Sequence, residues 1–309
     1  MKVSKNIIRH LEKINKWGEC ESNVSLRNLT TFKIGGNAKV LLKINTIESF
    51  IKVTDYISKI KLPYFIIGNG SNILASSKGY DGVLIKFGGD FDRIESYENI
   101  LECGCAVMLG TVLAKCRELN LTGFEDCVGI PASVGGATYM NAGAYNFEMS
   151  KVIESVVAFV DGKIKYFDNN SCEFGYRKSA FQSNKAIILR VRFKLEYGDK
   201  DKISSRCKEV IEKRKNSQPL EFPSAGSIFK RKDNLVVSKC LDDCKIKGIK
   251  IGNAEVSTKH ANFIINKGNA TSQDVVSLIN KIKKIFEEKY NERLNCEIKL
   301  LGEFDETIG

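Results

Sequence analysis

The chain has 309 residues, and its content of 43 % hydrophobic and 28 % charged residues is typical of a folded protein rather than a disordered one. The length suggests about two domains. No apolar run reaches the roughly 18 residues that a membrane-spanning helix needs, so we expect no membrane insertion. Lys and Arg outnumber Asp and Glu by 48 to 37, and the net charge of +11 suits an anionic ligand, a nucleic acid or a membrane surface without choosing among them.

Rare histidines and scattered cysteines limit the chemistry further. The two histidines, His10 and His260, exclude a three-histidine metal site, so proton transfer has to rely mainly on Ser, Tyr, Cys, Lys or carboxylates. The ten cysteines include no C-x-x-C pair, and residues 1–17 contain no hydrophobic secretory segment. We therefore expect reduced thiols, no metal site and a cytoplasmic protein.

Hydrophobic spacing predicts helices and strands along the whole chain. In chain order we predict a helix over 3–14, a helix over 47–60, a short buried strand over 64–67, a strand over 82–87, a helix over 109–119, a hairpin over 156–167, a strand over 186–195, a helix over 203–211, a long helix from about Thr271 and a final strand over 294–301. Asp161 and Gly162 suit a type I′ turn in the hairpin, because that turn needs positive φ at both positions.

The order of these elements predicts the fold class. Helices and strands are mixed without strict alternation, which favours an α+β fold over a regular doubly wound sheet. In the strand over 186–195, apolar residues alternate with Arg190, Arg192 and Lys194, so one of its faces is expected to be wet or to line a site. The charged, proline-containing segment 213–223 is interpreted as a domain boundary.

Three segments rich in small residues are candidates for binding an anionic ligand: 30–36, 68–72 and 129–144. Glycines in 68–72 allow backbone N–H groups to approach an anion such as a pyrophosphate, although the segment matches neither G-x-G-x-x-G nor a P-loop. The segment 129–144 is interpreted as a buried linker against which a large flat ligand can lie. The alternatives are a tight turn and a closely packed loop, but two such segments about 60 residues apart favour a ligand.

Four further positions could carry chemistry or bind a substrate. Arg177, after Tyr176, can hold a carboxylate by two parallel hydrogen bonds; the alternative is a surface arginine. Ser227 follows Ala225 and Gly226, which leave room around its hydroxyl; the alternative is a turn that opens the second domain.

The polar run 252–263 needs many partners or water, and its alternative is a solvated loop. Glu297 stands among apolar neighbours on the predicted final strand, so its carboxyl could be partly buried with a raised pKa. The alternative for Glu297 is an exposed position of the alternating strand.

Eight ordered motifs then resemble those of the UDP-N-acetylenolpyruvoylglucosamine reductase (MurB) family. They are T-T-F-K-I-G-G, G-N-G-S-N-I-L, G-I-P-A-S-V-G-G-A, M-N-A-G-A-Y, Y-R-K-S-A-F, P-S-A-G-S-I-F-K-R, V-S-T-K-H-A-N-F-I and L-N-C-E-I-K. The resemblance extends from about Asn28 to Gly302, nearly the whole chain. The uninterrupted stretch 176–186 is similar to the short type II form, which lacks an extra loop with a substrate-binding tyrosine.

The resemblance implies an α+β fold with an FAD-binding domain of the PCMH or vanillyl-alcohol-oxidase type in two subdomains, and a C-terminal α+β substrate-binding domain. The expected division is 1–27 for an N-terminal helix and lead-in, 28–88 for FAD-binding subdomain 1, 89–215 for FAD-binding subdomain 2 and 221–303 for the substrate-binding domain.

The resemblance also implies a reaction of peptidoglycan precursor synthesis. NADPH reduces a non-covalent FAD, and hydride passes from the flavin N5 to C3 of UDP-N-acetylglucosamine enolpyruvate. Protonation at C2 then gives UDP-N-acetylmuramate. A covalent flavin is not expected, because neither histidine lies in a flavin loop. The expected partners are therefore the enolpyruvyl sugar nucleotide and NADPH, with no nucleic acid, and we expect a monomer.

The resemblance assigns residue roles at matching positions. Ser227 matches the proton donor to C2, and Arg177 and Glu297 match the pair that holds the substrate carboxylate and stabilises the enol. The residues expected to bind FAD are Ile34, Gly35, Gly36, Gly68, Asn69, Gly70, Ser71, Asn72, Gly129, Ile130, Pro131, Ser133, Gly135, Gly136 and Ala137. The residues expected to bind the substrate are Tyr176, Lys230, His260 and Asn262.

Two departures from the family pattern affect the substrate contacts rather than the class: Lys-Asp-Asn follows Arg231, and a single glycine stands in 251–254.

Two alternative interpretations of the sequence differ in function. Another FAD oxidoreductase of the same flavin fold, such as an alcohol oxidase, explains the glycine-rich segments but not the set Ser227, Arg177 and Glu297. A nucleic-acid-binding protein would need basic clusters with interleaved aromatics, whereas the basic residues here are spread along helices.

Overall fold

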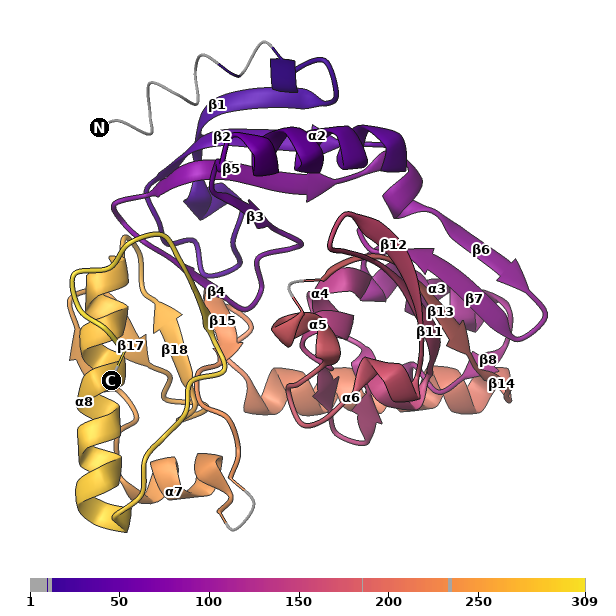
Figure 1. Ribbon diagram of the computed structural model, residues 1–309. Coiled ribbons are helices and arrows are strands. Elements are labelled where there is room, and N and C mark those ends of the chain that lie inside the picture. The colour runs from indigo at the N-terminus through magenta and orange to yellow at the C-terminus, as the bar shows by residue number, and fades with distance from the viewer. Residues whose placement is uncertain (1–9, 11–12, 185, 233–234, 309) are drawn as a thin grey trace.

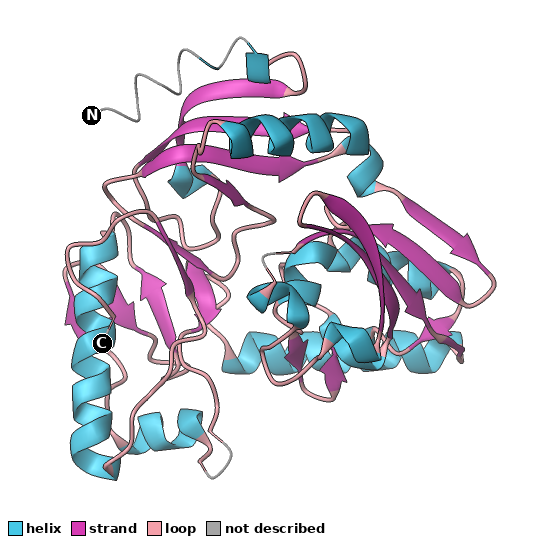
Figure 2. Cartoon of the chain, in the orientation of Figure 1, coloured by secondary structure: helices cyan, strands magenta, loops and turns pink. Residues whose placement is uncertain are grey.

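Residues 10, 13–184, 186–232 and 235–308 are described by the structure, which is a computed structural model. Three sheets of four or five strands, each accompanied by helices, make up the molecule (Figures 1 and 2). This mixture of largely antiparallel strands with helices confirms the α+β class. Within the described residues, none of the helices combines the length and the apolar composition that crossing a bilayer requires.

The first sheet has the strand order β1-β2-β5-β3. Its elements are β1 (Glu19–Ser25), β2 (Asn37–Ile44), α2 (Ile47–Lys59), β3 (Tyr64–Ile66) and β5 (Tyr80–Phe87). Alternating side chains bury both faces: Val40 belongs to the core shared with α2, whereas Leu41 packs into a smaller core with Leu26 and Leu84. The segments 30–36 and 68–72 adjoin strands β2 and β3 of this sheet, which is therefore held by packing on both faces.

The second sheet is antiparallel, with the order β12-β11-β13-β7-β6. Its elements and helices are β6 (Ile94–Tyr97), β7 (Ile100–Gly104), α3 (Leu109–Glu118), α4 (Val134–Tyr139), β11 (Ile153–Val160), β12 (Lys163–Asp168), α5 (Ala180–Ser183), β13 (Ile187–Lys194) and α6 (Lys200–Ser217). The predicted turn is confirmed, since Asp161 and Gly162 have φ values of 51° and 79°. The polar face of β13 is wet, because Arg192 pairs with Glu154 (Nε to Oε2, 2.8 Å) and is 43 % exposed.

The third sheet has the order β15-β18-β17-β16 and packs against the long helix α8 (Figure 1). Its elements are β15 (Ser224–Ser227), α7 (Val237–Asp243), β16 (Lys250–Ile251), β17 (Ala254–Val256), β18 (Phe263–Asn266) and α8 (Ser272–Tyr290). The predicted start of α8 is confirmed by a capping box, in which Thr271 and Asp274 each accept a hydrogen bond from the other's main-chain N–H.

Three short strand pairs lie outside these larger sheets. They are β4 (Ile73–Ala75) with β19 (Lys299–Leu301), β8 (Leu121–Thr122) with β14 (Glu196–Tyr197), and β9 (Gly143–Ala144) with β10 (Phe147–Glu148). The parallel β4–β19 pair brings the C-terminal part of the chain back to the first sheet, and Leu301 enters the same small core as Leu84. The residues just before β19 are therefore fixed next to the segment 68–72.

Some predicted elements differ from the structure. The strand expected over 294–301 has only residues Lys299–Leu301 in β19, because the preceding residues make only an isolated bridge between Cys296 and Phe229. The strand at 64–67 is present as β3, but Tyr64 is 39 % exposed rather than buried, since β3 is an edge strand.

The helix α6 continues to Ser217 and so includes the first five residues of the predicted boundary 213–223, because lysines and arginines favour helix as well as linker. The helix predicted over 3–14 lies mostly outside the described residues. The proposed four-part division of the chain stays a prediction.

Candidate active site

The three glycine-containing segments meet in space. The Thr31 N–H donates to the Gly70 carbonyl (3.3 Å), and the Asn69 amide donates to the Pro131 carbonyl (2.7 Å). A Cβ added at Gly68 would come 2.4 Å from the Ser133 hydroxyl, so only glycine permits this approach. The segments 30–36, 68–72 and 129–137 therefore form one surface, which hereafter is the glycine cradle.

Unpaired main-chain donors lie in the middle of the glycine cradle. Among the described residues, no protein acceptor is bonded to the main-chain N–H groups of 68–72. By contrast, Val134 and Gly135 donate to the Val107 and Cys105 carbonyls at 2.7 and 2.8 Å. Backbone groups left unpaired in a partly buried turn are suited to an anion. A pyrophosphate therefore fits the residues at 68–72 better than those at 134–135.

The segment 129–144 is not the linker that the sequence suggested, because it contains the helix α4. Ser133 caps this helix by accepting from the Gly136 N–H (3.3 Å). A Cβ at Gly135 would come 2.9 Å from that of Cys105, so the small residues permit α4 to pack closely on β7 and its following turn. Glycine-rich composition concealed the helix, since glycine normally disfavours this conformation.

Gly70→Ala is expected to disrupt the cradle, because Gly70 has a φ of +63° and an added Cβ would lie 2.2 Å from the Leu29 carbonyl oxygen. We predict a loss of about 2–4 kcal/mol in the free energy of unfolding, measured by denaturant titration. We also predict weaker retention of a flavin. The matched control is Gly110→Ala in α3, where the added methyl meets nothing within 4 Å and stability should be unchanged or slightly higher. Equal stability of the Gly70 variant and the wild type would show that the positive φ and the close Leu29 carbonyl do not require glycine at position 70.

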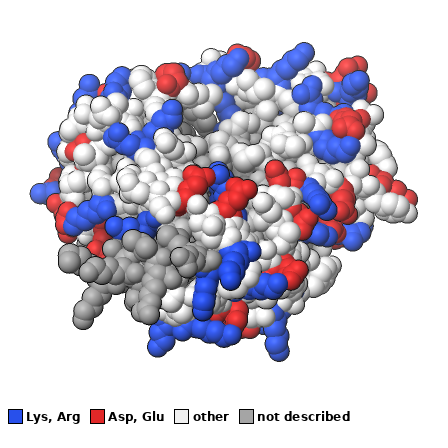
Figure 3. Space-filling view, turned by 90° about the horizontal axis from the view of Figure 1, so that it is seen from above, with Lys and Arg blue, Asp and Glu red and all other residues white. Residues whose placement is uncertain are grey.

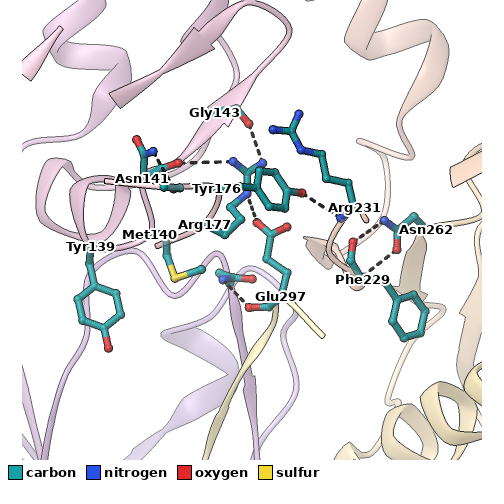
Figure 4. Close-up of polar contacts among 12 residues, drawn as sticks. Tyr139, Met140, Asn141, Gly143, Tyr176, Arg177, Phe229, Arg231, Asn262 and Glu297 are labelled. Carbon is teal, nitrogen blue, oxygen red and sulfur yellow. Dashed lines mark hydrogen bonds and ion pairs between the residues drawn. The ribbon is translucent and has the colours of Figure 1, made fainter. Parts of the chain in front are cut away.

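Arg177 and Glu297 are brought together from segments 120 residues apart (Figure 4). Arg177 Nε donates to Glu297 Oε1 at 2.6 Å, and the two side chains are only 16 % and 14 % exposed. Arg177 Nη2 also donates to the Gly143 carbonyl (2.8 Å), and Nη1 makes a long contact to the Asn141 carbonyl (3.5 Å). A guanidinium has five N–H donors, so two of them remain available to a ligand.

Glu297 is held between the glycine cradle and β15. Its main-chain N–H donates to the Ile228 carbonyl (2.8 Å), and its carbonyl accepts from the Asn72 amide (3.1 Å). Burial raises the pKa of the Glu297 carboxyl above its usual value, although Arg177 and Lys230 oppose the shift. The expectation of a raised pKa is therefore met, but Glu297 precedes β19 and does not lie on it.

Ser227 lies at the end of β15, next to Ile228, which bonds the main chain of Glu297. Its side chain is half-buried, and its hydroxyl makes no hydrogen bond to any described residue. Gly226 has a φ of +75°, and an added Cβ there would meet nothing within 4 Å, so the approach to this strand is open. The structure thus places a free hydroxyl close in the fold to the Arg177–Glu297 pair.

The residues expected to bind substrate fall into two groups. Tyr176 lies beside the pair: its hydroxyl accepts from the Arg231 N–H (3.1 Å), and its ring centroid is 4.1 Å from the guanidinium carbon of Arg231 and 4.9 Å from that of Arg177. Lys230 is close enough to Glu297 to oppose the rise of its pKa. Arg231 was not among the candidates, although it directly follows Lys230 in a recognised motif.

Asn262 and His260 hold the main chain next to the site through hydrogen bonds. The Asn262 amide brackets Phe229, donating to its carbonyl and accepting from its N–H at 2.9 Å each, and Asn262 is 7 % exposed. His260 Nδ1 accepts from the Asn262 N–H (3.2 Å), and burial lowers the pKa of this histidine. A solvated loop is excluded for this part of 252–263, because Ser257 is buried and accepts main-chain bonds from Lys259 and His260. Binding of substrate by either residue stays a prediction.

Comparison with known proteins defines the class. A family model described as an FAD binding domain matches residues 38–164, which include most of the glycine cradle. A second model, described as the C-terminal domain of UDP-N-acetylenolpyruvoylglucosamine reductase, matches residues 218–301, which include Ser227 and Glu297. The fold and the site are therefore those of an FAD-dependent oxidoreductase.

Relatives over the full length define the family. The chain is 39 % identical to UDP-N-acetylenolpyruvoylglucosamine reductase of Clostridium novyi (99 % of this chain, 100 % of the relative) and 41 % identical to that of Caldanaerobacter subterraneus subsp. tengcongensis (96 % and 98 %). The crystal structure of the Thermus caldophilus enzyme matches with a TM-score of 0.81 and 33 % identity, covering 92 % of this chain and 100 % of the other. The chain belongs to the UDP-N-acetylenolpyruvoylglucosamine reductase family.

Proposed function

We propose that the protein reduces UDP-N-acetylglucosamine enolpyruvate to UDP-N-acetylmuramate in peptidoglycan synthesis, with FAD as non-covalent cofactor and NADPH as co-substrate. The observation that carries this proposal is the buried Arg177–Glu297 pair beside the free hydroxyl of Ser227. These groups are the carboxylate clamp and the proton donor that reduction of an enolpyruvyl ether needs. The family assignment favours this reaction over an alcohol oxidase.

FAD would be held by the glycine cradle. The unpaired N–H groups of 68–72 support a role in binding its pyrophosphate, and the small residues of 34–36 and 129–137 leave space for the rest. When bound, FAD supplies the hydride for C3 of the enolpyruvyl group after reduction by NADPH.

Arg177 and Glu297 act on the other end of the double bond. The two remaining N–H donors of Arg177 bind the substrate carboxylate, while its bonds to Glu297 and Gly143 fix the plane of the guanidinium. Glu297 is proposed to stabilise the enol-like oxygen that develops on the carboxylate, and burial, which raises its pKa, makes this carboxyl easier to protonate than an exposed glutamate.

Ser227 then delivers a proton to C2. A serine hydroxyl is a weak acid, so nearby positive charge such as that of Lys230 has to stabilise the alkoxide that forms. Tyr176, Lys230, His260 and Asn262 are proposed to bind the sugar nucleotide, and burial, which lowers the pKa of His260, favours its neutral form.

Arg177→Lys is expected to lower kcat by roughly 10²-fold or more, because lysine keeps the charge but loses the planar fork. Steady-state oxidation of NADPH in the presence of the enolpyruvyl sugar nucleotide measures the effect. Arg190→Lys, on the exposed face of β13, is the control and should keep wild-type kinetics. Unaltered kcat in the Arg177 variant would remove the carboxylate clamp from the mechanism.

The compartment and partners are also proposed. Ten free thiols support a reducing compartment such as the cytoplasm. On the face shown in Figure 3, Lys and Arg are interspersed with Asp and Glu, which favours small anionic substrates over a nucleic acid. We also propose that the protein is a monomer and that its four parts are residues 1–27, 28–88, 89–215 and 221–303.

Product identification tests the proposed function. Purified protein incubated with NADPH and UDP-N-acetylglucosamine enolpyruvate should form a sugar nucleotide heavier by two hydrogen atoms, with one NADPH consumed per product, as measured by mass spectrometry and absorbance. Flavin released by denaturation should be FAD. Recovery of unreacted enolpyruvyl ether with a flavin-loaded protein would contradict the proposal.

A further inference from the structure

Arg214, in the last turn of α6, is a buried cation that has no counter-ion among the described residues. It is 7 % exposed, and its Nη1 donates to Gln218 Oε1 (3.2 Å). The Nε and Nη2 donors are also buried and have no hydrogen-bond partner among the described residues. The neighbouring Lys213 and Lys215 are exposed and pair with glutamates, as is usual on this helix.

In the part of the chain that the structure describes, no carboxylate pairs with this charge. Asp126 is the acidic group close enough to act on Arg214, but both of its carboxylate oxygens accept from Arg206 (2.6 and 3.0 Å). Burial lowers the pKa of Arg214, yet an arginine stays protonated in a folded protein. A buried guanidinium with open donors is strongly unfavourable unless an acceptor binds it.

The side chain lies against the glycine cradle. A Cβ added at Gly129 would come 3.0 Å from Arg214 Cδ and 3.5 Å from Nε, and Gly129 has a φ of +79°. The same turn contains Pro131, whose carbonyl accepts from Asn69 of the segment 68–72. On another side, the Tyr145 ring centroid is 5.5 Å from the guanidinium carbon. Glycine at 129 therefore makes room for the arginine at the edge of the proposed FAD site.

We infer that Arg214 is a cofactor-binding residue, whose Nε–H and Nη2–H donate to an electron-rich oxygen of FAD. The inference rests on the proposed use of FAD. Two parts of the cofactor carry oxygens of this kind: the pyrophosphate and the pyrimidine edge of the flavin. In either case the protein keeps an unfavourable buried charge in order to bind the cofactor.

The test compares the full-length wild type with Arg214→Met, Arg214→Lys and the charge-matched control Lys213→Met, each with and without FAD. Fluorescence titration should show FAD affinity at least about tenfold weaker in Arg214→Met, a smaller loss in Arg214→Lys, and no change in Lys213→Met. Without FAD, Arg214→Met should melt at the same temperature as the wild type or higher, because a buried charge is replaced by an apolar chain. With saturating FAD it should melt lower than the wild type.

The flavin midpoint potential distinguishes the two oxygens. A more negative potential in Arg214→Met places the arginine at the flavin edge, where its charge stabilises the reduced ring, and an unchanged potential with weaker affinity places it at the pyrophosphate. Equal FAD affinity in the wild type and Arg214→Met would overturn the assignment, and so would an Arg214→Met protein that is unfolded or melts lower without FAD. Failure of the wild type to bind FAD would instead overturn the proposed function.

Discussion

Ser227→Ala should separate the two halves of the reaction. Reduction of the flavin by NADPH is expected to proceed as in the wild type, whereas formation of product should fall by about 10²–10⁴-fold, the usual contribution of a positioned proton donor. The reason is that the Ser227 hydroxyl has no hydrogen-bond partner within the described part of the chain, and the next residue, Ile228, bonds the main chain of Glu297. Stopped-flow absorbance measures the first half, and product analysis measures the second.

The control for this variant is Ser224→Ala at the other end of β15. Ser224 uses its main-chain carbonyl, not its hydroxyl, to accept from Thr31 (2.8 Å), so turnover should be unchanged. If Ser227→Ala formed product at the wild-type rate, the proton would have to come from another group, and Ser227 would leave the mechanism.

Glu297→Gln should lower kcat by roughly 10²–10³-fold, because the amide keeps the shape but loses the charge-assisted bond to Arg177 and the acidic proton. The loss should appear in kcat more than in KM, since Glu297 is proposed to act on charge that develops in the transition state. Glu303→Gln, an exposed neighbour beyond β19, is the matched control and should have wild-type kinetics.

Glu297→Gln should also differ from the wild type in how its stability depends on pH. Burial raises the pKa of Glu297 above its usual 4.5, so the folded protein binds this proton more tightly than the unfolded chain does. The stabilisation from the protonated carboxyl is complete below pH 4.5 and is lost as pH rises through the folded pKa. Glu297→Gln should therefore gain stability relative to the wild type across that window. Parallel stability curves, measured by denaturant titration, would contradict the raised pKa.

Elements fixed by local signals could be predicted from the sequence. The helix α8 has an N-terminal capping box and an apolar stripe including Val275, Leu278 and Ile282, all of which are buried. The hairpin of β11 and β12 follows from its Asp-Gly turn. In both cases the determining contacts lie within a few residues of one another.

Features that depend on distant contacts could not be predicted in the same way. The helix α4 is permitted by packing of Gly135 on Cys105, which a single glycine-rich sequence does not reveal. Glu297 was identified as a candidate, but its partner Arg177 is 120 residues away, and its support by Asn72 depends on the β4–β19 pairing. Arg214 stands beside basic neighbours in the sequence, and its burial, which distinguishes it from the exposed Lys213 and Lys215, depends on distant contacts.

The most direct test of the central claim is stopped-flow mixing of the reduced protein with UDP-N-acetylglucosamine enolpyruvate without oxygen. The account predicts a yellow protein whose bleached flavin regains its colour at a rate at least equal to kcat, with one product formed per flavin. A protein that is colourless after incubation with FAD, or a flavin that stays reduced in the presence of this substrate, would contradict it.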